Sequence, residues 1–177
     1  MLLLSCEYIP SVNSSEEYDC LSILYPFHFR KYGVNMLSEE QVIEGFDNGL
    51  DCAMLVLRDV SDKIGMSAEE AVRTASCFGM GAMQGLACGA VTAGLIAIGC
   101  KYGGNAEDFS ERCILMAKRE EFVNGFRKEF KDLLCPQILG LDVRVPTDMA
   151  KIVQQDMFRK VCPKICKVAS ELLNKIL

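Results

Sequence analysis

Cysteine is the residue whose number and placement in this chain point most directly to chemistry. The chain has 177 residues, of which ten are Cys and one is His. It contains no Cys-x-x-Cys pair, so a zinc ribbon, a thioredoxin-type dithiol and covalent attachment of a c-type haem are all unsupported. The single His28 has no ligand pattern around it, so a Cys–His nucleophilic pair is not expected. Any sulfur site must therefore be assembled from cysteines that lie far apart in the sequence.

Four cysteines stand out by where they lie in the expected helices, three of them at helix ends and one inside a helix. Cys88 begins a stretch of small residues, and Cys135 and Cys162 each precede a proline, which is favoured in the first turn of a helix. A sulfur at a helix N-terminus meets unpaired N–H groups and the positive end of the dipole, which favour the reactive thiolate. We expect Cys52 inside a helix, one turn after Gly49, which would leave space beside its sulfur. Spacing alone leaves open whether the four meet.

The remaining cysteines carry weaker signals. Cys162 and Cys166 are spaced to lie on one helix face, which by itself is a weak indication of a metal site. The others are expected to be small buried side chains; they are Cys6, Cys20, Cys77, Cys100 and Cys113.

Composition and periodicity predict one all-α domain preceded by an extension. Half of the residues are hydrophobic, which excludes disorder as the main state, and the net charge of -5 argues against nucleic acid as a partner. Residues 1–35 lack helical periodicity and have no assigned function, and residues 36–177 are expected to form a compact bundle of about five to six helices. Capping boxes at Ser38 and Ser67 open two of them. The expected helices are 39–64, 67–77, 87–102, 107–134, 147–158 and 163–177.

The N-terminal residues predict a cytoplasmic protein. They lack the basic residues and the long apolar core of a secretory signal, so the cysteines are expected in a reducing compartment. The stretch between Arg73 and Lys101 carries no charge, but glycines interrupt it. Its strongly apolar part, 86–98, is shorter than the roughly 20 residues that span a membrane, so no span is expected.

The order and spacing of the four cysteines resemble the redox-active family named for its C, GCAxxG, C, C pattern. The matching segments are Cys52, Cys88-Gly-Ala-Val-Thr92, Cys135-Pro-Gln-Ile-Leu-Gly140 and Cys162-Pro-Lys-Ile165. The similarity covers about 38–177 and departs at Ala93, where the family has a glycine; here Gly94 follows.

The resemblance implies a small all-helical protein in which Cys52, Cys88, Cys135 and Cys162 form the functional set, as redox groups or metal ligands. It also implies that Gly89 and Ala90 belong to the cofactor-binding segment. The family is related to split-Soret-type cytochromes, but this chain lacks haem-attachment sequences, so no covalent haem is expected.

Two functions of different classes remain open. In the first, the four cysteines bind an iron–sulfur cluster or another metal, or cycle between dithiol and disulfide, in electron transfer; cluster or metal binding is slightly favoured because four thiolates need no His. In the second, the protein is a helical interaction module with structural cysteines, which acts through surface contact with a partner or forms a homodimer through its glycine-rich helix. The sequence names neither a redox partner nor a substrate, and whether the protein is an enzyme is left open.

Overall fold

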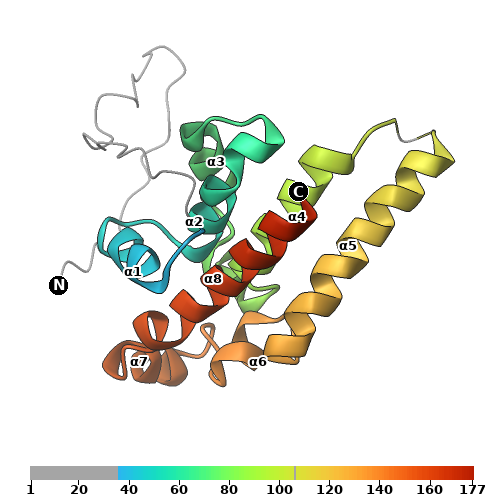
Figure 1. Ribbon diagram of the computed structural model, residues 1–177. Helices are drawn as coiled ribbons and strands as arrows, with labels where there is room; N and C mark the ends of the chain where they lie inside the picture. Colours follow the sequence, from blue (N-terminus) through green and yellow to red (C-terminus); the bar gives the residue numbers. More distant parts are fainter. Residues whose placement is uncertain (1–35, 106) are drawn as a thin grey trace, which may run out of the picture. The chain divides into compact units, whose positions relative to one another are not determined.

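The computed structural model describes residues 36–105 and 107–177, which fold into helices joined by short turns and loops (Figure 1). His28, Cys6, Cys20 and the predicted 1–35 extension lie outside these residues. Within the described ranges there is no strand, which confirms the all-α fold class. The α-helices are α1 (Glu39–Asp47), α2 (Cys52–Asp59), α3 (Ala68–Ala75), α4 (Gly89–Tyr102), α5 (Phe109–Phe130), α6 (Cys135–Leu139), α7 (Pro146–Gln154) and α8 (Met157–Ile176).

Helix α8 is the element around which the others pack. It contacts α1, α2, α4, α5 and α7, and Figure 1 shows it crossing in front of α4. Its buried face includes Ile165, Ala169 and Leu173. Ser170, also fully buried, donates a hydrogen bond to the carboxylate of Asp59 on α2. The core that supports the cysteines is therefore shared by α2, α4 and α8.

Helix α4 uses its small residues for packing inside the chain. It contacts α2, α5 and α8, and a Cβ atom added at Gly94 would collide with the ring of Phe122 on α5. Gly94 thus makes the close helix contact, while Ala93 is buried without such a clash. Phe122 and Phe126 are fully buried, and Phe130 packs against Phe126 with the two rings tilted and their centroids 4.8 Å apart. No helix in the described part of the chain is long and apolar enough to cross a membrane.

The predicted helix starts are only partly correct. Both capping boxes are present, at Ser38 with Gln41 and at Ser67 with Glu70. The predicted helix 39–64 is wrong, because the chain turns between α1 and α2 at Gly49, whose φ is +80°. Only glycine adopts that backbone without strain.

The last helix also begins earlier than predicted. It starts at Met157 rather than at Pro163, which lies inside α8. A proline within a helix removes one backbone hydrogen bond. Pro163 is itself fully buried in a well-packed face, and this burial offsets the lost bond.

Candidate functional site

Three of the four family cysteines lie at helix N-termini, but they are not the three that the sequence predicts. Cys52 is the first residue of α2, Cys88 is the N-cap of α4 and Cys135 is the first residue of α6. The prediction that Cys52 lies within a helix is therefore wrong. So is the prediction of Cys162 as an N-cap, because it lies in the second turn of α8.

A short backbone bridge joins the segments that carry Cys88 and Cys135. Ala87 pairs with Leu134 in an isolated antiparallel bridge. The N–H of Cys88 donates to the carbonyl of Leu133 over 2.7 Å, and the N–H of Cys135 donates to the carbonyl of Leu86 over 2.9 Å. Side chains alternate between the two faces of extended chain. The side chains of Cys88 and Cys135 therefore project from the same face of the bridge. Two cysteines 47 positions apart (135 minus 88) thus become neighbours.

The sulfur of Cys52 lies directly over the start of α4. A Cβ atom added at Gly89 would lie 2.6 Å from Cys52 Sγ and 2.8 Å from the carbonyl oxygen of Phe78. Gly89 therefore provides the space beside this sulfur. The prediction that Gly49 does so is wrong, because nothing lies within 4 Å of a Cβ added there.

Cys52 and Cys88 form a thiol pair. The interaction between the side chains of Cys52 and Cys88 is the first cause that raises the pKa of Cys52 well above its ordinary value, and burial is the second. The negative charge of neighbouring Asp51 acts in the same direction.

Asp51 positions Cys52 by capping α2. Its Oδ1 accepts hydrogen bonds from the N–H groups of Ala53 (2.9 Å) and Met54 (3.0 Å). It also accepts a bond from the N–H of Gly79, which ties the loop before α4 to the start of α2. The role of Asp51 was missed at the sequence level. The run Asn48-Gly-Leu-Asp51 carries the signal, a helix stop followed by an N-cap residue.

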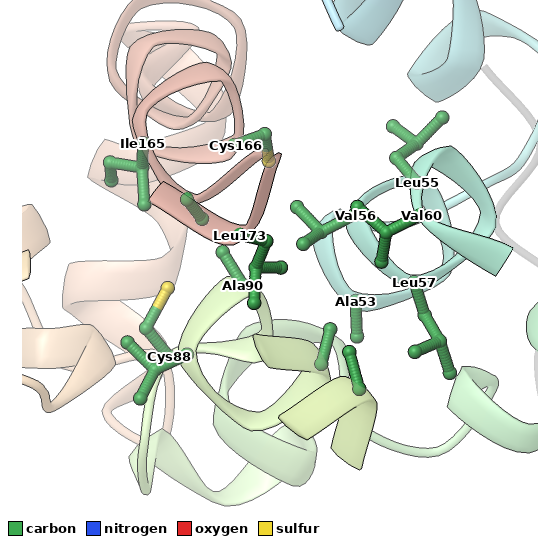
Figure 2. Packing of buried hydrophobic residues seen from close by; sticks show 14 of the residues in the cluster. Ala53, Leu55, Val56, Leu57, Val60, Cys88, Ala90, Ile165, Cys166 and Leu173 are labelled. Atoms are coloured by element: carbon green, nitrogen blue, oxygen red, sulfur yellow. The ribbon is translucent and has the colours of Figure 1, made fainter. Parts of the chain in front are cut away.

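The structure brings the four family cysteines together at one cavity of about 350 Å³. Cys52, Cys88, Cys135 and Cys162 all line it. Figure 2 shows the Cys88 thiol pointing toward α8, the helix that carries Ile165 and Cys166. The cavity lies between α1, α2, α6, α7 and α8, so closing it requires most of the bundle.

Burial favours the thiol form of Cys135 and Cys162. Removal from water raises the pKa of Cys135 to about 12, and the nearby Cys52 and Asp142 add to the shift. Burial is also the first cause that raises the pKa of Cys162, followed by Cys52 and Cys135. The prediction that helix ends would favour thiolates is therefore wrong for Cys135 and Cys162, because a dipole effect of up to about 1 kcal/mol is smaller than the cost of a buried charge.

The other cysteines divide into exposed and buried. Cys77, Cys100 and Cys113 are exposed, so the prediction that they are buried is wrong. Cys166 is fully buried, and its sulfur lies 4.0 Å from the carbonyl oxygen of Cys52. It does not line the cavity, and neither does Ala90, which is fully buried in the core.

A metal centre at this site would need the cysteine sulfurs as its ligands. Among the described residues, no group of three or more His, Cys, Asp or Glu side chains is placed to hold a metal ion. A four-thiolate site needs all sulfurs at about 2.3 Å from one centre. The cysteines as arranged therefore do not fit a bound metal or cluster.

Fold and site together define a small all-helical protein with a cysteine-lined cavity. A family model described as "Putative redox-active protein (C_GCAxxG_C_C)" matches residues 50–176. The chain belongs to this family, and the matched range includes all four cysteines of the cavity. Searches of curated proteins and of solved structures gave no match.

Proposed function

We propose that this protein is a thiol–disulfide redox protein in which Cys52 and Cys88 cycle between dithiol and disulfide. The observation that carries the proposal is the position of Cys52 Sγ against Gly89, the residue next to Cys88, with both cysteines lining the same cavity. Oxidation would form one S–S bond and remove two electrons and two protons from the pair. The expected setting is the reducing cytoplasm, where such thiols are returned to the reduced state.

Thiol mapping in a redox buffer tests this proposal. The cysteines that are exposed in the described part of the chain, Cys77, Cys100 and Cys113, are first replaced by Ser so that they form no intermolecular bonds. The protein is equilibrated with mixtures of oxidised and reduced glutathione, free thiols are alkylated, and the peptides are analysed by mass spectrometry. We expect a peptide pair linked through Cys52 and Cys88 that disappears on reduction. Absence of that link across about -180 to -300 mV, where many protein dithiols titrate, would contradict the proposal.

A second candidate is a thiolate-bound metal or iron–sulfur cluster. It is favoured by one observation, that four cysteines line the same cavity. The sulfurs would have to move toward a common centre, since the described residues present no ready group of metal ligands. Electron transfer would then use the bound group rather than a disulfide.

Elemental analysis of anaerobically prepared protein separates the two candidates. For the dithiol protein we expect a colourless sample with well under one iron or zinc per chain and no acid-labile sulfide. A visible absorbance band with stoichiometric iron and sulfide would replace the dithiol proposal by the cluster. Bound metal that is lost without any change in the Cys52–Cys88 link would instead be adventitious.

A further inference from the structure

The cavity beside the thiol pair has mainly hydrocarbon walls. Besides the cysteines, it is lined by apolar side chains from four helices, among them Phe46, Leu139, Ile152, Phe158 and Ile165. Its volume of about 350 Å³ lies in the range of small-molecule sites, which runs from roughly 300 to 1,000 Å³. A molecule the size of one substituted ring would fit against the sulfurs.

Among the described residues, every charged side chain that lines the cavity already has a partner. Arg159 forms ion pairs with Asp47 and, over 3.8 Å, with Asp156. Asp51 is held by the N–H groups that it caps. An ionic substrate would lose its hydration here and find no free counter-charge, which is strongly unfavourable.

From these walls and paired charges we infer that the cavity binds an uncharged, apolar two-electron acceptor and presents it to the Cys52–Cys88 pair. This inference rests on the proposed function. Two chemical sources share the required character, a substituted quinone and a dialkyl disulfide. The quinone would take two electrons and two protons to become a hydroquinone as the S–S bond forms. The dialkyl disulfide would be cleaved to two thiols, with the same two hydrogens coming from the protein.

Competition between matched oxidants tests the inference. Three are compared without oxygen: duroquinone, whose fully substituted ring cannot be alkylated by thiols; diethyl disulfide; and dithiodipropionate, a disulfide with two carboxylates. The measured quantity is the rate of Cys52–Cys88 disulfide formation, divided by the rate at which each oxidant reacts with free dithiothreitol. We expect at least one apolar oxidant to exceed the dicarboxylate by roughly tenfold or more, because burying the carboxylates is costly.

Each outcome of the oxidant comparison leads to a different conclusion. A preference for duroquinone alone assigns a quinone, a preference for diethyl disulfide alone assigns a dialkyl disulfide, and a preference for both assigns selection by apolarity. Equal normalised rates for all three oxidants would overturn the inference while leaving the dithiol function intact. If none of the three oxidants forms a Cys52–Cys88 link, it is the proposed function that fails.

A charge placed at the cavity wall gives an independent test. Val153 on α7 lines the cavity yet is 63% exposed, so Val153→Glu should fold. The next residue, Gln154, is exposed and does not line the cavity, so Gln154→Glu adds the same charge as a matched control. We expect Val153→Glu to slow oxidation by the preferred apolar oxidant by roughly fivefold or more, since the carboxylate draws water to the site. Equal rates for the two variants, with equal unfolding free energies, would overturn the inference.

Discussion

In the variant Cys52→Ala, the reversible loss of two thiols on oxidation is expected to fall to none. Cys52 lies beside the start of α4, next to Cys88, and it is also the thiol that contributes to the raised pKa values of Cys135, Cys162 and Cys166. Removing it leaves Cys88 without the partner of the proposed disulfide. The measurement is the titration of thiols with the exposed cysteines already replaced, followed by peptide mapping.

The matched control is Cys166→Ala. Cys166 is also buried and lies beside the backbone of Cys52, but its side chain does not line the cavity. We expect this variant to lose roughly 1–2 kcal/mol of stability through packing and to keep the Cys52–Cys88 link. If Cys52→Ala still loses two thiols, with Cys88 linked to Cys135 across the backbone bridge, then the bridge pair is the redox pair. If neither the parent nor the variants oxidise reversibly, the interaction-module hypothesis with structural cysteines is favoured.

The second large effect is expected for Gly89→Ala. The new Cβ would lie 2.6 Å from Cys52 Sγ and 2.8 Å from the Phe78 carbonyl oxygen. That oxygen also accepts a hydrogen bond from Ala82, which limits its movement. We expect a loss of about 2–3 kcal/mol in the free energy of unfolding, measured by chemical denaturation, because overpacking forces backbone shifts.

A glycine on the same helix provides the control for Gly89. Nothing lies within 4 Å of a Cβ added at Gly99, so Gly99→Ala should stabilise α4 by up to about 1 kcal/mol. Combining Gly89→Ala with Cys52→Ala removes one of the clashing atoms. The double variant should therefore be about 1 kcal/mol more stable than the sum of the two single effects predicts. Strict additivity would show that the sulfur does not rest on Gly89.

Several local features could be predicted from the sequence because their causes are local. The capping boxes at Ser38 and Ser67 depend on residues three positions apart. The burial of Phe122 and Phe126 on one face of α5 follows from their helical spacing. The break between α1 and α2 was missed although Asn48, Gly49 and Asp51 carry its signal, because the apolar periodicity continues across the turn.

The start of α8 could not be predicted in the same way. Pro163 is a valid first-turn residue, and nothing local indicates that the helix extends six residues before it, to Met157. The burial of Pro163 among the other helices stabilises the longer helix, which begins at Met157. The same change moves Cys162 from a helix end into a helix.

The sequence by itself determined the helical class, the family and the identity of the four cysteines. Only the tertiary structure decided that the sulfur of Cys52 lies against Gly89, next to Cys88, and that burial raises the pKa values of Cys135 and Cys162. The physical reason is that propensity, capping and periodicity act between residues a few positions apart. The contact of two sulfurs and the exclusion of water depend on segments that folding brings together from across the chain.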